Sequence, residues 1–259
     1  MKKKSIRGLA SLLLFSFLAV CYSGCDNRSG EEKAAPFLTG WKKYAAADLG
    51  RDGFGDAIYR TDIGYLCIED NKVILSDTPQ SERKLTLGTE SGYIQGDNRG
   101  EFGGQLNYYD EDDSGYTIAE PCHPRALFSC GGEIYMLHGL AHLSASYGCI
   151  SRIVMQDGRW CLVDTVSLGA TPQAYFADEA AKEIYVATNS SVVRVDIAQK
   201  DIKTDVLSEL PYVSRLSADA IVKYGEYVYV SMRHAVVTVN INTAETFYYI
   251  DKIGTSTQA

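Results

Sequence analysis

One strand pattern recurs along the second half of the chain and limits the folds that the chain can adopt. A turn followed by an apolar–tyrosine–apolar strand occurs three times, as GGEIYML, AKEIYVA and GEYVYVS. The central residues Tyr135, Tyr185 and Tyr229 are 50 and 44 positions apart. Each copy follows one short apolar strand and precedes two more. Four short antiparallel strands in about 40 to 50 residues is the repeat length of a β-propeller blade.

Alternating apolar and polar positions extend this pattern from about residue 57 onward, in runs rich in Tyr, Val and Ile that are broken by Gly, Asp and Asn. Three blades are predicted over residues 124–168, 171–210 and 216–251. Two upstream blades are predicted from hairpin patterns in DAIYRTDIGYLCIEDNKVILSD and GGQLNYYDEDDSGYTIAEP. A single blade cannot cover both of its faces, so blades pack against one another around an axis. We predict an all-β fold, a β-propeller of about five four-stranded blades, with six blades or an irregular ring as alternatives.

The recurrence resembles WD-like and YVTN-like bacterial propellers. The resemblance covers residues 124–251, although neither a GH to WD signature nor the YVTN tetrapeptide occurs. It is a resemblance of architecture, so it implies a fold and not a function.

The N-terminus has the composition of a bacterial export signal. MKKKSIR carries four positive charges and no negative one, and the apolar run GLASLLLFSFLAV follows it. That run has 13 residues, fewer than the roughly 20 that span a bilayer as a helix. Ser23, Gly24 and Cys25 resemble the end of a lipoprotein box, which implies cleavage before Cys25 and acyl chains such as palmitate on that residue. Tyr22 departs from the box, which prefers an aliphatic residue at that position. One alternative is lipidation of Cys21, and another is an ordinary secreted protein without lipid.

The rest of the chain divides into a tether and a fold. Residues 1–24 are predicted as signal peptide, residues 25–36 as a lipidated flexible tether that lacks large apolar side chains, and residues 37–259 as one propeller domain. Without the signal peptide the chain has 21 Lys and Arg against 33 Asp and Glu, a net charge of −12. Such a surface repels nucleic acid and anionic headgroups. The export signal and the lipid on Cys25 lead us to expect a membrane-anchored protein of the cell envelope that faces the periplasm or the exterior.

One acidic loop is a candidate calcium site. DLGRDGFGD resembles the loop of FG-GAP propeller repeats, and an aliphatic strand follows it as in that family. The resemblance implies that Asp48, Asp52 and Asp56, with the carbonyl of Phe54, hold Ca²⁺. Arg51 departs from the family pattern and brings a positive charge into the loop. The alternative is a turn in which the aspartates cap backbone amides.

Other potential metal ligands favour structural explanations. YDEDDSGYT echoes the start of an EF-hand loop but lacks its closing acid, so a hairpin turn is predicted. His138 and His142 are four residues apart in HGLAHLSASYG, without an HExxH motif, and are predicted to lie in a loop. The part of the chain predicted to fold has five cysteines, an odd number without a CxxC pair, which predicts at least one free thiol and no zinc site.

No catalytic residue is predicted, because the sequence has no GxSxG elbow and no phosphate-binding loop that leads into a helix. We expect a cell-envelope lipoprotein whose propeller is a noncatalytic binding or scaffold module for a protein or glycan, with loops such as HGLAHLSASYG and GDNRGEFGG facing the partner. Two alternatives stay open. One is a glycan-active enzyme with carboxylates at the propeller centre, and the other is a toxin immunity lipoprotein.

Overall fold

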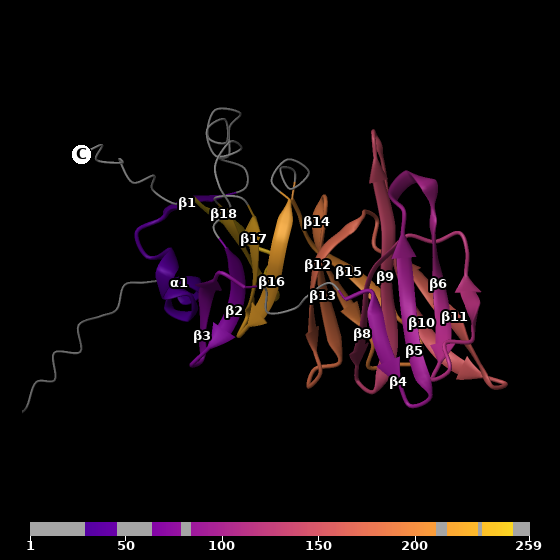
Figure 1. Ribbon diagram of the computed structural model, residues 1–259. Coiled ribbons are helices and arrows are strands. Elements are labelled where there is room, and N and C mark those ends of the chain that lie inside the picture. Colours follow the sequence, from indigo (N-terminus) through magenta and orange to yellow (C-terminus); the bar gives the residue numbers. More distant parts are fainter. Residues whose placement is uncertain (1–28, 46–63, 79–83, 211–216, 233–234, 251–259) are drawn as a thin grey trace, which may run out of the picture.

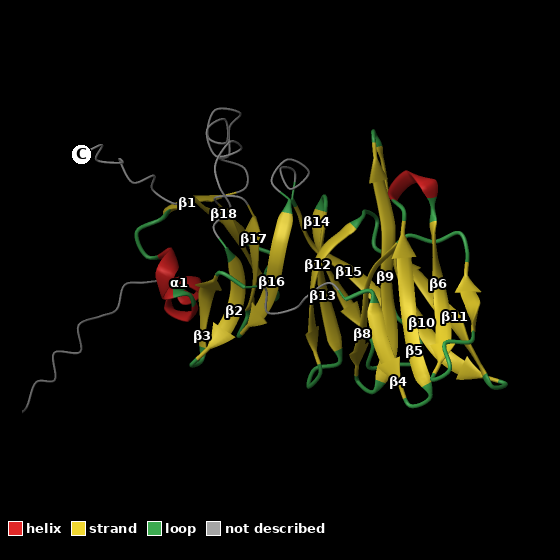
Figure 2. Cartoon of the chain, in the orientation of Figure 1, coloured by secondary structure: helices red, strands yellow, loops and turns green. Residues whose placement is uncertain are grey.

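Nineteen strands form five antiparallel sheets in the part of the chain that the computed structural model describes, which is residues 29–45, 64–78, 84–210, 217–232 and 235–250. Figure 1 and Figure 2 show the sheets standing side by side. The described residues also form three short helical segments. We number the sheets I to V in chain order. None of the described helices is long and apolar enough to cross a membrane.

The sheets are simple meanders of consecutive strands. Sheet I pairs β2 (Tyr65–Glu69) with β3 (Lys72–Ser76). Sheet II contains β4 (Thr86–Thr89), β5 (Gly92–Asn98), β6 (Gly104–Asp110) and β7 (Gly115–Ala119). Sheet III contains β8 (Pro124–Cys130), β9 (Glu133–His142), β10 (Ala145–Gln156) and β11 (Arg159–Ser167). Sheet IV contains β12 (Pro172–Asp178), β13 (Glu183–Thr188), β14 (Ser191–Asp196) and β15 (Lys203–Glu209).

Sheet V joins the two ends of the described chain. It contains β16 (Ala218–Tyr224), β17 (Tyr227–Met232), β18 (Ala235–Asn240) and β19 (Thr246–Ile250). The N-terminal strand β1 (Lys42–Ala45) pairs antiparallel with β19 as a fifth strand. The helical segments are α1 (Gly30–Ala34), η1 (Pro36–Leu38) and η4 (Gly100–Phe102).

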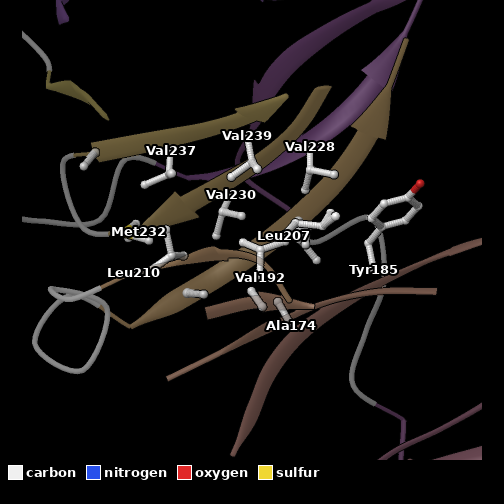
Figure 3. Close-up of a cluster of buried hydrophobic side chains, with 14 of the residues drawn as sticks. Ala174, Tyr185, Val192, Leu207, Leu210, Val228, Val230, Met232, Val237 and Val239 are labelled. Atoms are coloured by element: carbon white, nitrogen blue, oxygen red, sulfur yellow. The ribbon is translucent and has the colours of Figure 1, made fainter. Parts of the chain in front are cut away.

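Four hydrophobic clusters connect the sheets in series. Ile94 of sheet II meets Met136 of sheet III, and Leu137 of sheet III lies in one cluster with Val186 of sheet IV. Figure 3 shows the next cluster, where Val192 and Leu207 of sheet IV face the valines of sheet V. A fourth cluster joins sheet V to sheet I. Burying both faces in this way is the packing of stacked propeller blades.

The architecture is therefore the predicted all-β, propeller-like one. The three predicted C-terminal blades coincide with sheets III, IV and V. Sheet II is a complete four-stranded sheet, whereas sheet I has two strands in the described residues. Among those residues, no hydrophobic cluster joins sheet I to sheet II.

The recurrent tyrosines are core residues. Tyr135, Tyr185 and Tyr229 occupy the second strand of sheets III, IV and V, and each is at most 1% exposed. The repeat that predicted the fold is thus a repeat of buried packing positions, where aromatic side chains pack well against their neighbours on the pleated sheet.

The N-terminal segment corrects one prediction. Residues 25–36 were expected to form a flexible tether, but Ser29 caps α1 in a capping box with Glu32, and Ala35 is fully buried. The reason is the S-x-x-E spacing, which satisfies backbone amides at the start of even a short helix. The tether prediction is wrong for residues 29–36, which belong to the fold.

Candidate functional site

The first strands of sheets III, IV and V each contain a β-bulge at their second residue. The register of β8, β12 and β16 against the next strand shifts there by one residue. The residues in the bulges are Arg125, Gln173 and Asp219. A bulge leaves one residue outside the ladder and redirects its side chain, and bulges are frequent beside functional sites.

All three bulged residues line one cavity of about 230 Å³. The first strands contact one another in succession, so this cavity lies along the inner edge of the sheets. Its remaining described lining consists of Ala141, Thr171, Pro172, Ser217 and Ala218.

Hydrogen bonds fix the walls of the cavity across three sheets. The Arg125 Nε–H donates to the carbonyl of Gly139 over 3.0 Å. The amide of Ala218 in sheet V donates to Oε1 of Gln173 in sheet IV over 2.7 Å. The hydroxyl of Thr171 donates to the carbonyl of Tyr147 in sheet III over 3.0 Å. Side chains held in this way are preorganised for binding, which lowers the entropy lost when a ligand is bound.

The chemistry of the cavity is polar and mixed in charge. Arg125 brings a guanidinium, Asp219 a carboxylate and Gln173 an amide, while Thr171 and Ser217 add hydroxyls. This set can donate and accept hydrogen bonds on several sides, and its formal charges cancel. It suits a ligand that carries both donors and acceptors.

A second cavity, of about 260 Å³, lies further along the same inner strands. The stacked rings of Phe128 and Tyr175 have centroids 4.2 Å apart on its wall. Burial raises the pKa of Tyr175, which keeps its hydroxyl neutral. The other lining residues are Leu66, Ser129, Phe176, Ala177, Ala220 and Ile221. The inner edge is therefore polar where the strands begin and mainly apolar beyond.

The segment HGLAHLSASYG is not the loop that the sequence predicted. It is the end of the long β9–β10 hairpin, because β9 continues to His142 and β10 begins at Ala145. Ala141 lines the polar cavity, and Leu143 at the tip of the hairpin is 96% exposed. The second segment expected to face a partner, GDNRGEFGG, lies beside it, because His142 Nδ1 is 2.6 Å from Glu101 Oε2. Figure 1 shows the hairpin tip rising above the sheets.

The strand also separates the two histidines. Residues four apart in a strand are about 13 Å apart, so His138 and His142 cannot share one ion. His138 Nε2 lies 2.9 Å from the hydroxyl of Ser151. Burial, followed by the nearby His123, lowers the pKa of His138 to about 4, so this ring is neutral at physiological pH.

The acidic turn YDEDDSGYT is the predicted hairpin turn, between β6 and β7. The carboxylate of Asp110 accepts hydrogen bonds from the amides of Asp112 and Ser114, each over 3.0 Å, and from the hydroxyl of Ser114 over 2.6 Å. The Ser114 hydroxyl, together with these amides, lowers the pKa of Asp110. The turn thus satisfies its own carboxylate.

The predicted anchor and the predicted calcium ligands lie outside the described residues. They are Cys25 for the lipid and Asp48, Asp52, Phe54 and Asp56 for the ion. Within the described ranges, no group of three or more His, Cys, Asp or Glu side chains is arranged to hold a metal ion. The five cysteines of those ranges are all free thiols.

Sequence reasoning missed Arg125, Gln173 and Asp219. A signal was present, since the strands PRALFSC, PQAYFAD and ADAIVKY each place a polar residue between two small or cyclic ones at their second position. In a strand with period two, such a residue is expected to alternate with its neighbours between faces. Only the bulges bring the three side chains to one cavity.

No family model and no curated protein sequence matches the chain. Among solved structures, apo AztD from Citrobacter koseri is similar at 12% identity and a TM-score of 0.40, over 64% of this chain and 46% of that one. A quinoprotein alcohol dehydrogenase-like protein from Bacteroides thetaiotaomicron is similar at 11% identity and a TM-score of 0.42, over 64% of this chain and 47% of its own. Both are propeller-like proteins, and this chain spans about half the length of each.

Proposed function

We propose that this protein is a lipid-anchored, noncatalytic binding module of the bacterial cell envelope, and that it recognises a protein or glycan partner at the polar cavity. The observation that carries the proposal is the threefold recurrence of the bulge. Three successive sheets interrupt their ladders at the same position, and each directs a polar side chain into one space. Arg125 and Gln173 also hold neighbouring strands by hydrogen bonds, and together with Asp219 they give this space its polar and charged groups.

Binding suits this cavity better than hydrolysis. Glycoside hydrolysis generally uses a pair of carboxylates on opposite sides of the scissile bond. Of the described residues that line the two inner cavities, Asp219 alone is a carboxylate. The described residues therefore give no support to the glycan-active alternative, and no feature of them favours a toxin immunity role.

The recognition site is tested by crosslinking in native cells. A photoreactive residue in place of the exposed Ser217 reports whatever occupies the cavity. The double variant Arg125→Gln/Asp219→Asn removes both charges without changing the net charge. We expect it to lower the yield of the specific adduct at least about tenfold, the effect of losing one charge-assisted hydrogen bond.

The matched control is Arg159→Gln/Asp157→Asn, which makes the same charge change at the β10–β11 turn. It should leave the adduct intact. Equal losses in both double variants would show that the cavity is not the recognition site. A glycan partner is detected by a binding measurement. Purified envelope polysaccharide is tested against the wild-type protein and each of the two double variants, with the same expected outcomes.

The anchor at Cys25 is supported by the apolar leader and the small residues before it. Several acyl chains hold a protein at a membrane far more firmly than one chain does. Cys25→Ala should accordingly release the protein from the membrane fraction, or leave an uncleaved precursor, whereas Cys21→Ala should not. A fully processed Cys25→Ala protein that stays in the membrane fraction contradicts the anchor.

Calcium at Asp48, Asp52, Phe54 and Asp56 stays part of the proposal. A ligand that binds only the folded state raises stability by mass action, by about 2.7 kcal/mol at a concentration one hundred times its Kd. Calcium should raise the melting temperature of the wild-type protein and not that of Asp52→Ala. An unchanged wild-type melt in excess calcium removes the ion from the proposal.

A further inference from the structure

The N-terminal segment Ser29–Ala45 is fixed to the fold immediately after the proposed anchor. Glu31 of α1 is 3% exposed and accepts a hydrogen bond from the Tyr249 hydroxyl over 2.8 Å. Its backbone carbonyl accepts from the Tyr229 hydroxyl over 3.1 Å, and its carboxylate pairs with Lys43 of β1. These contacts hold α1 and β1 against sheet V as one body.

The short connection to the anchor limits where this segment can be. Residues 26–28 alone lie between Cys25 and Ser29. Four residue steps span at most about 14 Å, whatever their conformation. If Cys25 carries lipid at the surface of a bilayer, α1 lies within that distance of the headgroups.

The charge of the segment differs from that of the rest of the chain. Ser29–Ala45 contains three lysines and two glutamates, a net charge of +1, whereas residues 46–259 contain 17 Lys and Arg against 30 Asp and Glu, a net charge of −13. Lys33 and Lys42 are exposed, and the glutamate Glu31 is buried and paired. An anionic surface therefore attracts this end of the molecule relative to the remainder.

Half-buried aromatic residues accompany the lysines. Trp41 and Phe37 pack edge to face, with ring centroids 5.6 Å apart, between η1 and β1. Tryptophan is favoured at the level of lipid headgroups, where its ring is apolar and its N–H remains solvated.

We propose that the surface of Ser29–Ala45 lies against an anionic phospholipid headgroup layer, with Lys33, Lys42 and Trp41 nearest to it. This rests on the proposed lipid at Cys25. It orients the molecule with α1 at the membrane and sheets II and III away from it. Figure 1 shows α1 and β11 at opposite ends of the row of sheets.

The two tryptophans of the chain test this orientation, because Trp41 lies in the segment and Trp160 lies in β11. The full-length lipidated protein is reconstituted into vesicles of phosphatidylethanolamine and phosphatidylglycerol whose acyl chains are brominated near the headgroup. Trp160→Phe leaves Trp41 as the reporter, and Trp41→Phe leaves Trp160. We expect bromine to quench Trp41 at least about twofold, since an interfacial ring lies within its reach, and to leave Trp160 unquenched.

A second arm tests the lysines. The double variant Lys33→Gln/Lys42→Gln is made in the Trp160→Phe protein, so that bromine quenching of Trp41 reports the docked orientation. Each substitution should shift the equilibrium away from this orientation by roughly fivefold, which lowers the quenching. The matched control Lys182→Gln/Lys200→Gln removes two exposed lysines in turns of sheet IV and should have no effect. Replacing phosphatidylglycerol by phosphatidylcholine should reproduce the loss caused by the double variant.

The outcomes separate the two proposals. A protein that does not float with the vesicles overturns the anchor, and with it this orientation. A protein that floats while Trp41 and Trp160 are quenched equally overturns the orientation alone. Equal effects of the two lysine pairs overturn the assignment of Lys33 and Lys42 to the headgroup contact.

Discussion

The hydroxyl of the buried tyrosine has its hydrogen-bond partner within the same sheet in sheets III and IV, but outside the four consecutive strands in sheet V. In sheets III and IV the tyrosine hydroxyl donates to a glutamate two residues earlier in the same strand. An arginine lies directly opposite the tyrosine on the next strand. This arginine pairs with an aspartate on the strand after that. The sets are Glu133, Tyr135, Arg152 and Asp164 in sheet III, and Glu183, Tyr185, Arg194 and Asp205 in sheet IV.

Sheet V lacks this internal network. Tyr227 stands where the glutamate would be, and Thr238 lies opposite Tyr229 in place of the arginine. The Tyr229 hydroxyl instead donates to the backbone carbonyl of Glu31 in α1. A buried hydroxyl needs a partner wherever it comes from. Sheets III and IV thus provide their own partners, whereas sheet V depends on the N-terminal segment.

The side chain of Glu31 also docks α1 on sheet V, and its removal should have the greatest cost in stability. Glu31→Ala removes the acceptor of the Tyr249 hydroxyl and the counter-ion of Lys43. Burial by itself raises the pKa of Glu31, but hydrogen bonds from Lys43 and Tyr249 outweigh it and lower the pKa, so the carboxylate is charged in the fold. We expect the free energy of unfolding to fall by about 3 kcal/mol, measured by urea denaturation.

Glu32→Ala is the control for this prediction. Its side chain takes part in the capping box of the same helix but is only partly buried. Loss of a cap costs about 1 kcal/mol. If both variants cost the same, the docking of α1 through Glu31 is not what stabilises sheet V.

The contrast also explains how far the sequence could predict the fold. The positions of Tyr135, Tyr185 and Tyr229 predicted three sheets with their strands, because burial imposes the same apolar spacing in each. The same repeat does not reveal which groups bond the hydroxyls. Glu31 is remote in sequence from Tyr229 and Tyr249, and a charged residue near the N-terminus is ordinarily solvated. Its burial depends on three partners that come together only in the folded state.

The candidate site was less predictable than the fold. Strand periodicity assigns Arg125, Gln173 and Asp219 to a face of regular pleat, whereas the structure gives each a bulge. A bulge depends on pairing with the neighbouring strand, and that pairing is not encoded locally. The extent of β9 was missed for a related reason, since Gly139 suggested a loop but is accommodated against Gly148 in the hairpin.

Sheet III also differs from sheets IV and V in a buried histidine, which should make its stability depend on pH. His138 in sheet III, Thr188 in sheet IV and Met232 in sheet V occupy equivalent positions, each opposite the first residue of the first strand. The folded-state pKa of His138, about 4, is depressed below the unfolded value of about 6.5. The unfolded state therefore binds more protons between these values, and stability falls as pH falls through that range.

Linkage gives the expected size of this effect. Between pH 7 and pH 5, His138 should cost the wild-type protein about 2 kcal/mol of unfolding free energy. His138→Gln keeps a hydrogen-bonding side chain beside Ser151 but does not titrate, so its stability should depend less on pH by that amount. Because every other titrating group is common to both proteins, parallel pH profiles would refute the acid sensitivity of this position in sheet III.

Two tyrosine variants distinguish a hydroxyl bonded to α1 from a hydroxyl bonded within its own sheet. Tyr229→Phe removes the hydrogen bond to Glu31, which should lower the protection of α1 amides against hydrogen exchange by roughly fivefold, the equivalent of about 1 kcal/mol. The amide of Ala35, which donates to the Glu31 carbonyl, is a direct reporter. Tyr185→Phe deletes the hydroxyl of an equally buried tyrosine, whose partner, Glu183, lies in its own strand. It should weaken sheet IV and leave Ala35 unchanged, since sites with no shared partner act independently. If both variants loosen α1 alike, the N-terminal segment responds to global stability, and the distinction between self-sufficient sheets and a dependent sheet V does not hold.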